Sequence, residues 1–212
     1  MELFDALLNR RTIRKFKPDM PSKEEIEQIL DAARMAPSAH NKQMWQFIVI
    51  TNQHYKDQLS LVVASAYDKI ISLTDDEEEI KKIKYSKGYA TFFNRAPVVI
   101  AVLMDPFQNT VETLLRRKNY LETEIKRIRP APDLQSIGAA VENLSLAAYG
   151  LGYGTCWMTA PIVAYEEIEE ILSVDDSNQV VAMVCLGKSD NGHSELALKN
   201  KKSLEDIVTY ID

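Results

Sequence analysis

Two short runs of apolar and β-branched residues most constrain how this chain can fold. Residues 97–103 (PVVIAVL) and 180–186 (VVAMVCL) contain no polar side chain. Each run is too short for a typical helix, and β-branched residues favour strands, so we predict two strands and expect the one at 97–103 to be buried on both faces. Such strands need helices on each side of their sheet. The sequence therefore predicts an α+β fold.

The rest of the chain supplies the helices and two further strands, at 45–51 and 155–159. Ser22 and Glu25 form a capping-box pattern before one helix, and Asp133 is a predicted N-cap for another. The predicted helices span residues 2–9, 22–35, 53–72, 75–94, 133–149 and 165–172.

Residues 105–132 mix basic residues with prolines and lack a clear pattern. We expect an irregular or helical excursion there, and a candidate lid. No repeat, low-complexity linker or abrupt change of composition divides the chain. A single domain over residues 1–212, with helices around a small mixed sheet, is the expected organisation.

Composition excludes several partners. The net charge is −6 and the pI is about 5.2, so the overall field repels nucleic acid and anionic membranes. The start, MELFD, lacks the features of a signal peptide, and no apolar stretch approaches the roughly 20 residues that span a bilayer. We expect a cytoplasmic protein in which Cys156 and Cys185 are buried free thiols.

Two segments hold the polar chemistry. Residues 36–45 (APSAHNKQMW) join a predicted helix to a strand and offer hydrogen bonds without a paired nucleophile and base. Residues 9–17 (NRRTIRKFK) place five cationic side chains and one hydroxyl in nine positions, which suits a phosphate or other anion. Arg10 and Arg11 could instead complement the negative end of the preceding helix.

Other chemistries lack their motifs. The chain has no GxSxG elbow, P-loop or Rossmann fingerprint, and its three histidines are too widely spaced for a zinc pair. A site rich in cations and amides but poor in nucleophiles suggests that a bound cofactor performs the reaction. Flavin mononucleotide (FMN) fits, because its phosphate binds cations, its ribityl and pyrimidine groups bind polar side chains, and its ring needs apolar walls.

The RRTIR start of residues 10–14 and the PSAHNKQMW loop together resemble the FMN-dependent nitroreductase family in order, spacing and chain length. The resemblance implies a nitroreductase-like fold, with a central mixed, mostly antiparallel sheet flanked by helices, in an intertwined homodimer. It implies an oxidoreductase with FMN at the dimer interface that uses NADH or NADPH. The expected acceptors are nitroaromatics, quinones or similar electron-poor small molecules, reduced by a ping-pong mechanism.

The resemblance also implies the site residues, with the flavin itself carrying the chemistry. Arg10 is expected at the phosphate and Arg14 near the pyrimidine, where a cation would tune the flavin. The loop is expected to reach the flavin from the partner subunit. The candidate cofactor-binding residues are Arg10, Arg11, Thr12, Arg14, Pro37, Ser38, Ala39, Asn41, Gln43, Trp157, Met158, Thr159, Lys199 and Lys201.

The sequence departs from the family pattern at three positions in two segments. Ala39 stands where a second serine is common, and Met44 stands where proline is common. Lys201 replaces a frequent arginine, which keeps the charge but removes the bidentate fork.

Two alternatives stay open. The same flavin fold could perform another redox task, such as heterocycle oxidation, reductive dehalogenation or oxygen-dependent cleavage of flavin. The protein could also be a flavin-binding module without catalysis. The residues of the 105–132 segment do not discriminate among these substrates.

Overall fold

The four predicted strands form one antiparallel sheet in the order β1-β2-β4-β3. The computed structural model describes residues 2–107, 109–190 and 201–211. The α+β class is confirmed, and a parallel component enters through an isolated bridge between Thr12 and Thr155. The strands are β1 (Trp45–Ile50), β2 (Val98–Met104), β3 (Gly154–Met158) and β4 (Gln179–Gly187).

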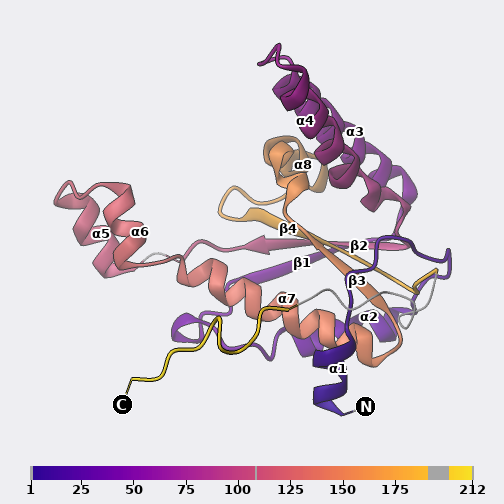
Figure 1. Ribbon diagram of the computed structural model, residues 1–212, viewed down its shortest axis with the longest axis horizontal. Helices are drawn as coiled ribbons and strands as arrows, with labels where there is room; N and C mark the ends of the chain where they lie inside the picture. Colours follow the sequence, from indigo (N-terminus) through magenta and orange to yellow (C-terminus); the bar gives the residue numbers. More distant parts are fainter. Residues whose placement is uncertain (1, 108, 191–200, 212) are drawn as a thin grey trace.

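Helices cover both faces of the sheet (Figure 1). On one face lie α2 and α7, and on the other lie α3 and α8, with α4 packed against α3. These helices are α2 (Lys23–Ala33), α3 (Gln53–Ile71), α4 (Glu77–Thr91), α7 (Pro132–Gly150) and α8 (Tyr165–Leu172).

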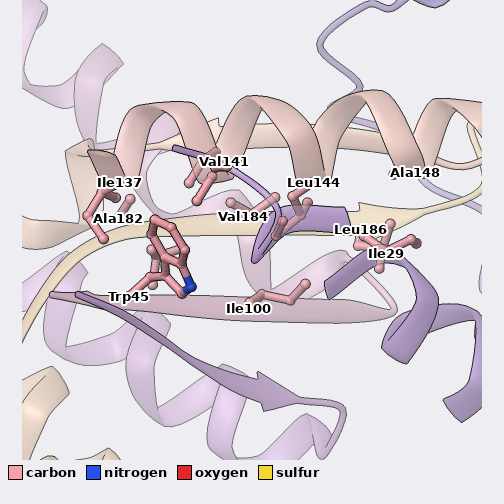
Figure 2. Close-up of a cluster of buried hydrophobic side chains, with 14 of the residues drawn as sticks. Ile29, Trp45, Ile100, Ile137, Val141, Leu144, Ala148, Ala182, Val184 and Leu186 are labelled. Carbon is pink, nitrogen blue, oxygen red and sulfur yellow. The ribbon is translucent and has the colours of Figure 1, made fainter. Parts of the chain in front are cut away.

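Alternation along β2 explains its lack of polar residues. Ile100 packs in the cluster beneath α2 and α7, whereas Val99 packs in the cluster beneath α3 and α8. Figure 2 shows Val141 and Leu144 of α7 over the sheet at Ile100. Both faces of β2 are therefore buried, as the sequence predicted.

Local signals were confirmed at one helix start and wrong at another. Ser22 Oγ accepts the Glu25 N–H, and Glu25 accepts the Ser22 N–H at 2.8 Å, so the capping box forms. Asp133 lies inside α7 rather than at its cap, because the helix begins at Pro132 after Ala131, whose φ is 48°. The proline fixes the first helical φ, so the cap moves two residues upstream.

Three elements lie at the ends of this arrangement. The short helix α1 (Leu3–Asn9) contacts α7, while α5 (Thr110–Arg117) and α6 (Glu122–Ile128) form a hairpin that stands apart from the sheet (Figure 1). The 105–132 excursion is thus helical. Among the described residues, no helix is both long and apolar enough to cross a membrane.

Candidate functional site

The cationic segment is attached to the sheet edge beside β3. The Ile13 N–H donates to the Thr155 carbonyl at 2.8 Å, and the Lys17 N–H donates to the Lys188 carbonyl at 2.9 Å. A Cβ at Gly154 would overlap the Ile13 side chain, so only glycine permits this approach. Buried Ile13 therefore fixes the register of the arginines on either side of it.

A cavity of about 350 Å³ lies where this segment meets β3 and α7. Four of the predicted residues line it, although Thr12 and Trp157 lie 145 positions apart in the sequence (157 − 12). The complete lining is Arg10, Thr12, Glu142, Ser145, Thr155, Trp157 and Thr159.

Strand alternation decides which side chains of β3 reach the cavity. Thr155 and Trp157 line it, whereas Cys156 and Met158 point into the core beneath α3 and α8. The Cys185 and Met158 sulfur atoms lie 3.6 Å apart in that core. The predicted buried thiols are confirmed, and the side chain of Met158 lies away from the cavity.

The indole of Trp157 is 44% exposed and leans on α7. Its Cη2 atom lies 3.6 Å from the position that a Cβ at Gly138 would occupy, an ordinary contact. Part of the side chain thus remains available as an apolar wall.

Three arginines of the segment have different partners. Arg10 Nε lies 3.3 Å from Glu142 Oε1 on α7. Arg11 donates to the carbonyls of Leu8 and Arg10 at 2.7 and 2.8 Å, so it folds back onto the end of α1 and satisfies helix carbonyls. The guanidinium of Arg14 lies over the ring of Tyr89, outside the cavity lining.

The predicted polar loop is held near the start of α7, outside the cavity lining. The Ala39 N–H donates to Ser136 Oγ at 3.1 Å, and the Gln43 N–H donates to Ser38 Oγ at 2.9 Å. Ser136 and the cavity residue Ser145 are nine positions apart, which is roughly 13 Å along a helix. Pro37, Ser38, Ala39, Asn41 and Gln43 consequently do not line the cavity within one chain.

The loop has an unusual backbone. His40, Asn41 and Gln43 have φ angles of 54°, 52° and 48°, in the left-handed region that favours glycine. Such conformations cost free energy and are concentrated at binding and catalytic sites. The loop is therefore a candidate binding element in its own right.

The structure describes one of the two predicted C-terminal lysines. Lys201 is exposed and is absent from the lining, and Lys199 lies outside the described residues.

Sequence reasoning missed Glu142, Ser145 and Thr155 as lining residues. Two signals were present. Glu142 is the one charged residue between positions 134 and 149, in an otherwise apolar and small-residue helix. Thr155 has the same strand parity as Trp157, which places both side chains on one face.

The lining suits binding better than nucleophilic chemistry. It supplies a cation, hydroxyl groups and an aromatic face, and it contains no histidine, cysteine or lysine. Burial raises the pKa of the nearby Cys156 thiol, which keeps it protonated and unreactive. Across residues 2–107, 109–190 and 201–211, no cluster of three metal-ligating side chains occurs.

A larger cavity, of about 920 Å³, lies between α8 and the start of β4. Its lining includes the carboxylates of Glu166, Glu169, Glu170, Asp175 and Asp176. Such a surface repels phosphate groups, so size alone does not identify the site.

Comparisons with known proteins bear on the family and the fold. A sequence model described as Nitroreductase family matches residues 7–188. A nitrobenzene nitroreductase from Ectopseudomonas oleovorans is 26% identical over 220 residues, covering 98% of this chain and 96% of that protein.

Two crystal structures have the same fold. A BluB-like flavoprotein from Clostridium difficile 630 has 30% sequence identity and a TM-score of 0.88, with full coverage of both chains. A nitroreductase with bound FMN from Desulfitobacterium hafniense DCB-2 has 23% identity and a TM-score of 0.71, also over both whole chains.

Proposed function

The chain belongs to the nitroreductase family, and from that premise we propose that it is an FMN-dependent oxidoreductase. It uses NADH or NADPH to reduce nitroaromatics, quinones or similar electron-poor acceptors. One observation carries the proposal: Arg10, Thr12, Trp157 and Thr159, expected at the cofactor from two distant segments, line one cavity. The names of the relatives, a nitrobenzene nitroreductase and an FMN-containing nitroreductase, support it.

The cavity residues fit the groups of FMN. Arg10 supplies charge for the phosphate, the hydroxyls of Thr12 and Thr159 can donate to phosphate or ribityl oxygens, and Trp157 gives the ring an apolar wall. FMN, when bound, accepts a hydride from the nicotinamide and passes electrons to the acceptor. The protein's part is to bind, orient and exclude water.

We propose a homodimer in which the partner's loop completes each site. Within one chain the loop 36–45 contributes no side chain to the cavity lining, so we infer that the partner's loop supplies these groups. The helix α1 favours this, because Phe4 is 74% and Leu8 67% exposed while its buried residue is Ala6. Apolar faces of this kind are normally covered.

Sedimentation and FMN titration test the dimer. We expect a dimer that binds one FMN per chain. A monomer that binds FMN as tightly as the wild-type preparation would contradict the proposed interface.

The function is tested by the visible spectrum of the purified protein, recorded anaerobically before and after NADH and then NADPH. We expect flavin absorption that either nicotinamide bleaches and that a nitroaromatic or quinone restores. Steady-state kinetics should give parallel double-reciprocal lines, because both substrates use one site in turn. A colourless protein that takes up no added FMN would overturn the proposal.

The second candidate keeps the flavin and changes the redox task. The fold match with a TM-score of 0.88 is to a protein described as BluB-like rather than as a nitroreductase, which favours considering this alternative. Residues 105–132, our proposed lid, would then determine the specificity for a different substrate. If the reduced protein does not transfer electrons to nitroaromatics or quinones but its bound flavin is degraded in air, flavin cleavage is the favoured activity. A flavin that no nicotinamide reduces would favour a non-catalytic binding module.

A further inference from the structure

A cation–π contact joins Arg14 to Tyr89 on the helix α4. The Arg14 Cζ atom lies 5.7 Å from the centroid of the Tyr89 ring, which is within cation–π range. Arg14 is exposed and has no carboxylate partner among the ion pairs of the described residues. The Tyr89 ring is therefore its main structural restraint.

A second tyrosine restrains Tyr89 in turn. The Tyr85 and Tyr89 hydroxyls are hydrogen-bonded at 3.0 Å, and their ring centroids lie 4.8 Å apart. The two residues are four positions apart on α4, so their side chains share one face of the helix. This pairing limits the rotamers that Tyr89 can adopt.

The α4 backbone is exposed next to Tyr89. Gly88 lies three positions after Tyr85, and a Cβ there would meet nothing within 4 Å. Glycine in a helix interior is unfavourable relative to alanine, and no neighbour in this chain requires it. An open backbone face beside a fixed cation leaves room for a ligand to approach closely.

Each side of this contact adjoins a segment that lines the cavity. Arg14 follows the lining residue Thr12 by two positions, and α4 packs against the turn Ala160–Ala164 that follows Thr159. Arg14 and the α4 face thus lie next to both segments that supply the cavity.

We propose that Tyr89, held by Tyr85, is a positioning residue that fixes the Arg14 guanidinium at the flavin site, beside an α4 face that Gly88 keeps open for the ligand. This inference rests on the proposed function, because it needs Arg14 to act on bound FMN. A cation fixed near the flavin pyrimidine stabilises the charge that reduction creates.

A double-mutant cycle tests the proposal in the dimeric protein. The variants are Arg14→Ala, Tyr89→Leu and the combination, and the readouts are the FMN dissociation constant and the midpoint potential of bound FMN. We expect Tyr89→Leu to weaken FMN binding roughly two- to fivefold and to lower the midpoint potential of bound FMN. We expect the same direction of change for Arg14→Ala. In the Arg14→Ala background, Tyr89→Leu should have no further effect.

Conservative variants separate the ring from the hydroxyl. Tyr89→Phe keeps the ring under the guanidinium and should rescue most of the binding and the potential, whereas Tyr85→Phe should give an intermediate result. Tyr55→Leu is the matched control, because Tyr55 is 44% exposed against 43% for Tyr89 but lies on α3. Leucine is a good helix former, so each of these exposed sites should tolerate it.

Two results would overturn the inference. One is an additive cycle, and the other is a Tyr89→Leu protein that matches Tyr55→Leu in both readouts. If the wild-type protein itself binds no FMN, the proposed function fails, and the role of Tyr89 fails with it.

Discussion

Arg10 Nε lies 3.3 Å from Glu142 Oε1, so the arginine expected at the cofactor phosphate already has a carboxylate partner. The two side chains are 29% and 43% exposed, and ion pairs in such positions contribute roughly 0–1 kcal/mol. A phosphate entering the cavity has to share or displace this partner. Glu142 thus tunes how strongly the cavity attracts an anion.

Replacing that carboxylate should strengthen FMN binding. We expect Glu142→Gln to lower the FMN dissociation constant by up to about fivefold, because the neutral amide forms no ion pair with Arg10 and does not repel phosphate. Fluorescence titration of the apoprotein with FMN measures this. Glu27→Gln is the control. It removes the exposed ion pair with Lys23 on α2 and should leave the FMN dissociation constant unchanged.

Removing the arginine should have the opposite and larger effect. We expect Arg10→Ala to weaken FMN binding roughly ten- to a hundredfold, since hydrogen bonds to charged groups contribute about 1.5–3 kcal/mol. Arg34→Ala, which breaks an exposed ion pair with Asp31, is the matched control. Equal FMN affinity in the two variants would remove Arg10 from the proposed site.

Gly154 should be necessary for the position of the cationic segment along β3. Gly154→Ala introduces a methyl group that overlaps Ile13, and we expect about 1–3 kcal/mol of lost stability together with weaker FMN binding. Chemical denaturation and FMN titration measure the two effects. The Gly154→Ala/Ile13→Ala double variant should be less destabilised than the sum of its single variants, and strict additivity would show that the two side chains do not clash.

Tyr153 should make stability pH-dependent in the alkaline range. Burial, followed by the hydrogen bond to Glu25 at 2.8 Å, raises the pKa of Tyr153 to about 12, against about 10 in an unfolded chain. The folded state therefore holds the phenol proton more tightly, so its stabilising effect is complete below pH 10 and is lost as the pH rises towards 12.

We expect Tyr153 to account for a loss on the order of 1–2 kcal/mol between those pH values. Denaturation curves of the wild-type protein and of Tyr153→Phe at pH 8, 10 and 11.5 separate the contribution of Tyr153 from that of other groups that titrate at alkaline pH. The difference in unfolding free energy between the two proteins should shrink as the pH rises, and a constant difference would contradict the shifted pKa.

Local patterns determined the secondary structure well. The apolar run at 97–103 predicted β2 because an uninterrupted β-branched segment can be stable only where both faces are buried. The Ser22 and Glu25 pair predicted the start of α2 because capping is an interaction within four residues. Asp133 was misassigned because Pro132 and the left-handed Ala131 set the helix start instead.

The sequence by itself determined the four strands, the main helices and the family, because these depend on residues close together in the chain and on recurring motifs. Only the tertiary structure decided that Glu142 faces Arg10, that Thr155 joins the cavity while Met158 points into the core, and that the loop 36–45 is held near the start of α7 outside the cavity lining. Those relationships join residues far apart in sequence, and they follow from how the strands pair and how α7 packs on the sheet, which no local pattern specifies.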